Sequence, residues 1–595
     1  MTAVFEARYP ATRPSSTRGQ RRPSPPVERD DRLPPWRNEG RLALIAALAL
    51  ALLMVLLPFG QLVLTALSPE GVFAPADAFA EITGRAGRTA LLHTLETGLV
   101  SALGSVLIGA SFALVLALTD MRGKKRVGFL FVLSMLMAPQ VIALAFMTAA
   151  GPSSPLLGAI GLAPPPGSAN PFRSSGGIMV VLALHHAPLV MITVSAGLRQ
   201  MPGNLVEAAL IDGAGPGALL SRIILPLLHP HLAAGALLAF VAAIGNFGIP
   251  ALLGMPVNYQ TLPTLIYQRI SSFGPSGIAE AAALCLPLAL LAGLGATLSV
   301  LLLRNRTTAL EVGAPLAPFI ALGRWRTPVT TTVWLVLAAG LLLPLLSLAS
   351  AALTPAFGVR LTLQTLTLDK FAEVLLRQPV TLRALRNSFL YAGAAAILLG
   401  FFALPLVYAL HRQAGRLRGL IEGVFDIPYA LPGIVLAIAC ILVFLRPLPL
   451  IGVSIYGTPL IILFAYLVRF LPLALKAPLA AMAQLPADQE EAATVFGASC
   501  WQRLRHTVFP ALAPAAIAGA LLVFLTGFNE LTVSALLWSA GTETLGVALF
   551  SLEEAGLASE ASALALSATA VILVTMLALD RLHKRLPEGV IPWRV

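Results

Sequence analysis

The sequence predicts an all-α protein whose helices cross a membrane many times. Of its 595 residues, 57% are hydrophobic and only 11% are charged, and the mean hydropathy is +0.84. Soluble proteins carry about 25% charged residues, so this composition excludes a soluble globule and a disordered chain. Uninterrupted apolar runs of twenty or more residues favour helical spans over the alternating strands of a membrane β-barrel.

Twelve apolar runs are long enough to be spans, and both ends of each are approximate. They cover residues 42–67, 91–118, 127–150, 177–198, 232–254, 278–303, 329–353, 388–410, 420–445, 457–475, 512–537 and 558–580. Prolines lie inside several runs, among them Pro139, Pro188, Pro428 and Pro432. Membrane helices tolerate such prolines and kink at them, so each run is counted as one span.

The spans divide the chain into two similar halves with polar ends. Residues 1–40 are rich in Arg, Pro and Ser and predict a disordered tail. Residues 41–310 form the first half, with six spans, and 311–328 form a linker. Residues 329–585 form the second half, also with six spans, and 586–595 form a C-terminal tail.

The net charge of +12 is explained by membrane topology. When the N-terminal tail is placed in the cytoplasm, 29 of the 40 Lys and Arg residues fall on the cytoplasmic side. This is the positive-inside bias of membrane proteins, so no nucleic-acid partner is needed. An even number of spans then puts both termini in the cytoplasm.

No residue cluster predicts catalysis, a cofactor or a metal site. The three cysteines are far apart, and the sequence holds no GxxxxGK[ST] phosphate loop. His185 and His186 are adjacent in the fourth span, where side chains point about 100° apart, so we expect a buried pair rather than metal ligands.

The chain contains an internal repeat with an offset of 284 residues. Residues 207–226 read EAALIDGAGPGALLSRIILP, and residues 491–510 read EAATVFGASCWQRLRHTVFP. Each copy lies in a predicted cytoplasmic loop between the fourth and fifth spans of its half. The halves therefore have the same orientation, which is typical of transporters with a pathway between parallel repeats.

These segments resemble the EAA motif of ABC importer permeases. The first copy matches at Glu207, Ala208, Ala209, Gly213, Ile223, Leu225 and Pro226. The second matches at Glu491, Ala492, Ala493, Gly497 and Pro510, but has Thr507 and Phe509 in place of Ile and Leu. The resemblance implies the MetI-like fold of type I ABC importers and a bacterial inner-membrane location.

The resemblance also implies partners. In this family the EAA loops are coupling helices that sit in clefts on two copies of a cytoplasmic ABC ATPase, which binds ATP and Mg²⁺. A periplasmic or extracellular solute-binding protein delivers the solute. The residues agree with this, because small side chains permit close approach, the glycine permits a break, and Pro226 and Pro510 are expected to end the element. This chain itself is expected to hold no cofactor and to be no enzyme.

The sequence indicates the transported solute less directly than it indicates the class of protein. Fusion of two six-span halves resembles the permeases for ferric iron, thiamine and some phosphonates, and the segment from Phe528 onward most resembles the ferric-iron group. Asn246, Asn529 and Glu530 lie in nearly equivalent places of the fifth and eleventh spans and are candidates for the translocation pathway. A helix-to-helix hydrogen bond or a position near the helix end is the alternative for each.

Two further alternatives remain open. Glu543, Glu553, Glu554 and Glu560 lie in or beside the last exported loop and form either an acidic rim or an ordinary solvated loop. The whole chain could also be an ion-coupled secondary transporter, although that class would leave the EAA loops unexplained.

Overall fold

The computed structural model describes residues 41–68, 72–272, 277–304, 319–411, 416–447 and 452–582. These residues are mostly helical, and the β-structure among them is an isolated bridge between Thr119 and Ile320. The predicted tails 1–40 and 586–595 lie outside the described residues, as does part of the predicted linker.

The first half begins with a long helix and a short one, followed by a bundle that contains all the remaining elements. These are α2 (Arg41–Leu67), α3 (Pro75–Thr83), α4 (Arg85–Leu118), α5 (Lys124–Leu136), α6 (Pro139–Ala150), α7 (Pro155–Ala159), α8 (Ser175–Arg199), α9 (Gly203–Ile211), α10 (Pro216–Leu219), η2 (Leu220–Ile224), α11 (Leu225–Ile244), α12 (Gly248–Leu253), η3 (Met255–Val257), α13 (Leu262–Ser271) and α14 (Gly277–Arg304).

The second half repeats this order. Its elements are η4 (Gly323–Trp325), α15 (Arg326–Leu337), η5 (Ala338–Leu342), α16 (Leu343–Ala352), α17 (Asp369–Ala372), η6 (Glu373–Arg377), α18 (Pro379–His411), α19 (Arg416–Ala430), α20 (Gly433–Phe444), α21 (Pro459–Ala483), α22 (Ala487–Val495), α23 (Cys500–Arg503), η7 (Leu504–Val508), α24 (Phe509–Phe528), α25 (Ser534–Leu537), α26 (Leu545–Glu554) and α27 (Ala558–Leu582).

The helical segments agree with the predicted runs but are less continuous. Among the described residues, ten segments are long and apolar enough to cross a membrane, and the bent pair α19–α20 makes an eleventh. α2 has 27 residues and coincides with the first predicted run.

The prediction that each run is one kinked helix is wrong for four runs. Run 127–150 is divided into α5 and α6, and run 420–445 into α19 and α20, which meet at 100°. Pro139 begins α6 and Pro432 precedes α20. A proline cannot donate a backbone hydrogen bond and its ring collides with the carbonyl four residues earlier, so the helix stops there. Runs 232–254 and 512–537 also break, after Ile244 and Phe528.

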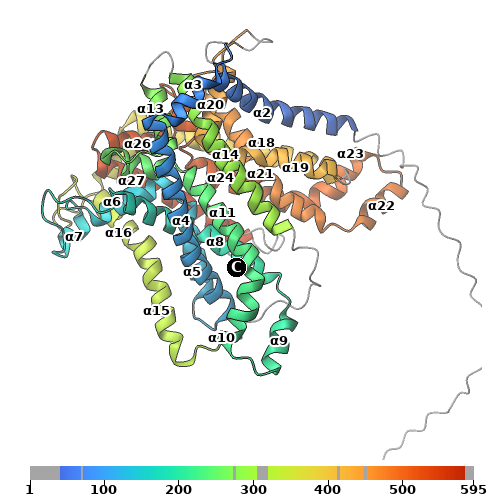
Figure 1. Cartoon of the computed structure of the whole chain (residues 1–595), viewed down its shortest axis with the longest axis horizontal. Helices are drawn as coiled ribbons and strands as arrows, with labels where there is room; N and C mark the ends of the chain where they lie inside the picture. The colour runs from blue at the N-terminus through green and yellow to red at the C-terminus, as the bar shows by residue number, and fades with distance from the viewer. Residues whose placement is uncertain are drawn as a thin grey trace, which may run out of the picture.

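Each half has a core of three helices, and its first long helix reaches across to the other half. α4, α8 and α11 contact one another in the first half, as do α18, α21 and α24 in the second. α2 contacts α14 of its own half and α20 of the other, and α16 contacts α27 and α6 in the same manner. This exchange of first helices ties the halves together (Figure 1).

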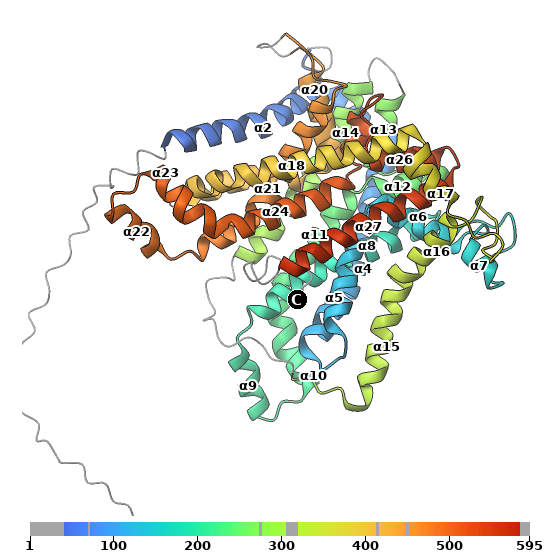
Figure 2. The same cartoon turned by 180° about the vertical axis from the view of Figure 1, so that it is seen from behind.

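The two repeated loops extend from the same side of the molecule. α9 and α22 lie on separate arms there, and the N-terminal end of α2 and the C-terminal end of α27 also point toward that side (Figures 1 and 2). The short helices α3, α13 and α26 lie on the opposite side.

Candidate functional site: two repeated loops and a pocket between the halves

The helices α9 and α22 occupy equivalent places in the two halves. Each follows the long helix of its half, α8 or α21, and each begins after a proline, Pro202 or Pro486, in an extended conformation. Glu207 and Ala208 are exposed on α9, and Glu491 and Ala492 are exposed on α22. Ala209 and Ala493 are half-buried. The structure thus brings each predicted Glu-Ala-Ala group onto a helix with a solvent-facing side.

Both helices end at the predicted glycine. Gly213 has φ +82° and Gly497 has φ +77°, a left-handed conformation that side chains other than glycine rarely adopt. The amide of Ala214 donates to the carbonyl of Ala209, and that of Ala498 donates to Ala493. These are Schellman ends, so the glycines reverse the chain after each helix. A Cβ at either glycine would meet no atom within 4 Å, so the backbone conformation alone demands glycine there.

The predicted role of Pro226 and Pro510 is wrong, because they do not end the repeated loop. The chain turns after the glycine, and a continuous helix then runs through η2 into α11 and through η7 into α24. Pro226 and Pro510 each lie two residues after the π-helical turn, near the start of the long helix. Because proline has no N–H, one backbone hydrogen bond of the helix is missing there, and the wider π-helical turn lies beside this interruption. The same spacing separates η5 from Pro344 and η6 from Pro379.

The second copy reaches the same geometry despite its different residues. Ile223 and Thr507 lie in the two π-turns, and Leu225 and Phe509 begin the helices that follow. The ring of Phe509 lies 6.5 Å from that of Trp501 on α23. The first copy has no counterpart of this aromatic contact, because the repeat offset pairs Trp501 with Gly217.

Large apolar side chains are exposed where α9 and α22 end, a feature that the sequence analysis did not single out. Ile211 is 86% exposed, Val495 is 84% exposed and Phe496 is 89% exposed. Ile211 and Val495 are related by the 284-residue offset. Exposed apolar groups that cluster outside the lipid-spanning helices mark a surface for a protein partner.

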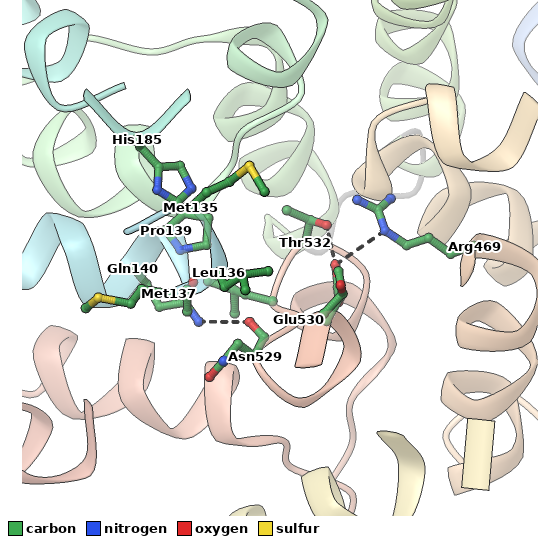
Figure 3. A pocket seen from close by; sticks show the side chains of 14 residues that line it. Met135, Leu136, Met137, Pro139, Gln140, His185, Arg469, Asn529, Glu530 and Thr532 are labelled. Carbon is green, nitrogen blue, oxygen red and sulfur yellow. Dashed lines mark hydrogen bonds and ion pairs between the residues drawn. The ribbon is translucent and has the colours of Figure 1, made fainter. Parts of the chain in front are cut away.

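A pocket of about 200 Å³ lies between the halves, where their long helices break (Figure 3). Its first-half wall comes from the α5–α6 break, α8 and α12, and its second-half wall comes from α21, α24 and the segment after α24. The lining residues are Met135, Leu136, Met137, Ala138, Pro139, Gln140, His185, Gly248, Arg469, Thr526, Asn529, Glu530, Leu531 and Thr532. The side-chain amide of Gln140 donates across the halves to the carbonyl of Asn529 at 3.3 Å.

The predicted pathway residues lie at the breaks rather than inside continuous spans. Asn246 follows α11, and Asn529 and Glu530 follow α24. Asn246 and Glu530 are related by the 284-residue offset, and the side chain of each accepts hydrogen bonds from backbone amides a few residues later. The side-chain oxygen Oδ1 of Asn246 accepts from the backbone amide of Ile249, and the Glu530 carboxylate accepts from the amides of Val533 and Ser534. Each side chain therefore satisfies backbone amides at the start of the short helix that follows, α12 or α25. Asn529 and Glu530 line the pocket.

Arg469 on α21 lines the pocket and lies within the predicted apolar run 457–475. Its Nε lies 4.0 Å from the Glu530 carboxylate. A charged residue inside a span costs about 2.5–3.5 kcal/mol on insertion scales, and such residues mark solute pathways. A mid-span arginine was therefore the sequence signal for this site.

The histidine pair is buried, as predicted, and one of its members also lines the pocket. His185 and His186 are buried, with ring centroids 5.0 Å apart, and Nδ1 of His185 lies 3.1 Å from the carbonyl of Ser134. His185 also lines the pocket, and the offset pairs it with Arg469. Within the described ranges, no group of three or more His, Cys, Asp or Glu side chains could hold a metal ion.

The proposed acidic rim is not supported, because three of its carboxylates face basic partners from other segments. Glu543 lies 3.5 Å from Arg383, Glu560 lies 2.7 Å from Lys370, and Glu553 lies 3.8 Å from Arg173. These pairs join separate parts of the side opposite α9 and α22.

We expect the Glu553→Gln variant to be more heat-stable than the parent protein at alkaline pH. Burial raises the pKa of Glu553 from 4.5 to about 7, although Arg173 lowers it. The folded state therefore retains the proton where the unfolded state has lost it, so stability falls as pH rises from 4.5 to about 7. The full effect is about 3 kcal/mol.

Melting temperatures in detergent check this expectation. The variant should exceed the parent at about pH 8.5 and approach it near pH 5. Glu373, whose side chain is 43% exposed, is changed to Gln as a control and should leave the profile unchanged. An equal difference between Glu553→Gln and the parent at both pH values would contradict the assignment.

The repeated bundle, the paired loops and the pocket between the halves together define a helical membrane transport subunit. The chain belongs to the family of binding-protein-dependent transport system inner membrane components, whose profile matches residues 109–308 and 396–591. One match falls in each half, so this is a fused ABC importer permease. The family consists of transport subunits rather than enzymes.

Similar proteins support this assignment. A probable ABC transporter permease protein, y4fN, of Sinorhizobium fredii is 28% identical over 522 residues, which cover 85% of this chain and 90% of that protein. An Fe(3+)-transport system permease protein, FbpB 2, of Haemophilus influenzae is 26% identical over 376 residues, 63% of this chain and 70% of its own length. A putative 2-aminoethylphosphonate transport system permease protein, PhnV, of Salmonella paratyphi A is 30% identical over 197 residues, 33% of this chain and 72% of that protein.

Proposed function

We propose that this permease couples a separate ATPase to the import of ferric iron across the bacterial inner membrane. The observation that carries the coupling is the pair α9 and α22: two equivalent helices on one side, each closed by a left-handed glycine and each ending in exposed apolar side chains. We place this side, and with it both termini, in the cytoplasm, in accord with the distribution of basic residues.

Two copies of an ABC ATPase would bind there, one on each helix, and would hold the ATP and Mg²⁺ that the chain itself is not expected to bind. Their closure would move α9 and α22 and, through the continuous helices that follow, α11 and α24. α11 ends at Ile244, shortly before Gly248 of the pocket, and α24 ends at Phe528, next to Asn529 of the pocket, so motion at the loops would reach the contact between the halves. A solute-binding protein would deliver the solute from the opposite side.

Ferric iron is supported by relatives named as ferric transport permeases. A phosphonate is the second candidate, because the PhnV relatives are 30% identical over about a third of the chain.

Reconstitution tests both the ATPase-driven mechanism and the assignment of ferric iron as the solute. The chain, the ATPase and the binding protein encoded with it are placed in vesicles, and ATP-dependent uptake of radioactive Fe(III) and of 2-aminoethylphosphonate is measured. We expect Fe(III) uptake only with all three components and ATP. Uptake of the phosphonate instead would overturn the iron assignment alone. Uptake by the chain alone under an ion gradient would overturn the ATPase-driven mechanism.

A further inference from the structure

We propose that the pocket between the halves binds a solute through an anionic oxygen, and that Arg469 selects for negative charge there. This inference rests on the proposed transport function and adds a substrate class to it. The solute would be a small oxyanion-bearing molecule, such as a phosphonate, or a metal ion carried with oxyanion ligands.

Several polar atoms of the pocket are buried without a hydrogen-bond partner. They belong to Arg469 (one terminal guanidinium nitrogen), Gln140 (Oε1) and Asn529 (both side-chain amide atoms). Gln140 is 1% exposed and Asn529 is 5% exposed. An unsatisfied buried polar group costs about 1–3 kcal/mol, so each of these atoms predicts a bound solute or water within its reach.

The carboxylate of Glu530 already accepts hydrogen bonds, whereas a terminal nitrogen of the Arg469 guanidinium has no hydrogen-bond partner. It accepts from the backbone amides of Val533 and Ser534 and from the hydroxyl of Thr532 (Figure 3). Arg469 approaches it to only 4.0 Å, beyond hydrogen-bond distance. Glu530 therefore holds the chain after α24 and limits the charge of the site, while Arg469 keeps donors for another oxyanion.

The comparison of the halves shows that this charge is confined to one wall. The offset of 284 residues pairs Arg469 with His185 and Glu530 with Asn246. The first half thus has a histidine and an asparagine where the second has an ion pair. A bare ferric ion would meet a guanidinium and no free carboxylate, whereas an oxyanion would meet the donors of Arg469.

Reaction of a cysteine in the pocket with charged thiol reagents tests the selection without knowledge of the solute. Thr526 lines the pocket, and its hydroxyl donates a hydrogen bond to the carbonyl of Leu522 on the same helix. Thr526→Cys is made in a background with Cys285, Cys440 and Cys500 changed to Ala. The assembled transporter is treated during ATP turnover with the sulfonatoethyl and the trimethylammonioethyl methanethiosulfonates.

We expect the anionic reagent to react about tenfold faster than the cationic one, relative to their rates with a free thiol. The ratio should fall to near one in Arg469→Gln, persist in Arg469→Lys and rise in Glu530→Gln. A ratio near one in the parent, an unchanged ratio in Arg469→Gln, or no reaction with either reagent would overturn the proposal. ATPase co-purification confirms that each variant is assembled.

Uptake by the same variants separates this inference from the proposed function. Ferric citrate and 2-aminoethylphosphonate are supplied as probes, and Arg469→Gln should reduce uptake of the transported one. If the parent carries no ferric iron but keeps the anionic preference, the iron assignment fails and the role of Arg469 stands.

Discussion

Replacing Phe496 with aspartate is expected to reduce the affinity of the chain for its ATPase by about 100-fold, and to reduce ATP-driven uptake in parallel. Phe496 is 89% exposed at the end of α22. Burying an aromatic side chain in a partner's pocket commonly contributes 2 kcal/mol or more, and a carboxylate placed there would also lose its water. Binding is measured with the purified ATPase and the chain in nanodiscs.

Ile211→Asp should weaken binding less, because an aliphatic side chain buries less area than an aromatic one. Leu363, which is 97% exposed in a segment between α16 and α17, provides the control. Leu363→Asp should leave ATPase affinity unchanged. Equal losses in Phe496→Asp and Leu363→Asp would show that the surface at α22 has no special role.

Gly433→Ala is expected to destabilise the protein by about 1–3 kcal/mol and to abolish most transport. A Cβ at Gly433 would lie 2.0 Å from the hydroxyl of Thr532 and 2.6 Å from a terminal nitrogen of Arg469. Gly433 begins α20 at the break, so the added methyl would push apart α20 and the segment that holds Glu530.

The other half supplies a matched rescue for this variant. In the first half, Gln140 follows Pro139 just as Gly433 follows Pro432 in the second. Gly248, which the repeat offset pairs with Thr532, packs against Gln140. The double variant Gly433→Ala/Thr532→Gly should therefore recover part of the lost melting temperature and uptake, because it removes the collision with Thr532 but not the one with Arg469. Gly419→Ala is the control, because a Cβ there meets no atom within 4 Å. Failure of the double variant to improve on Gly433→Ala would contradict the packing argument.

The sequence was sufficient to predict the helical membrane class, the two parallel halves and the paired loops. Apolar run length decides between a helix and other structures in lipid, and the 284-residue repeat requires no structure to detect. The glycines at 213 and 497 were also informative, since a glycine at the end of a short helix predicts a left-handed turn.

The breaks and the pocket could not be predicted in the same way. A proline in an apolar run is compatible with a kink or with a complete break, and neighbours decide which occurs. Pro188 lies inside continuous α8, whereas Pro139 and Pro432 lie at breaks. The pairing of Gln140 with Asn529 spans 389 residues and depends on how the halves meet. The sequence left Glu530 open between a pathway residue and a hydrogen-bonded one, because its bonds to the amides of Val533 and Ser534 appear only in the folded chain.

The distance between α9 and α22 during ATP turnover tests the coupling mechanism most directly. Asn204 and Asp488 are exposed, lie on these two helices and are related by the repeat offset. Both are changed to Cys in the background without native cysteines and spin-labelled, and the distance is measured by double electron–electron resonance in the assembled transporter. We predict a shorter distance with ATP bound and a return to the longer one after hydrolysis. A distance that stays the same while ATP is hydrolysed and solute is transported would contradict the account.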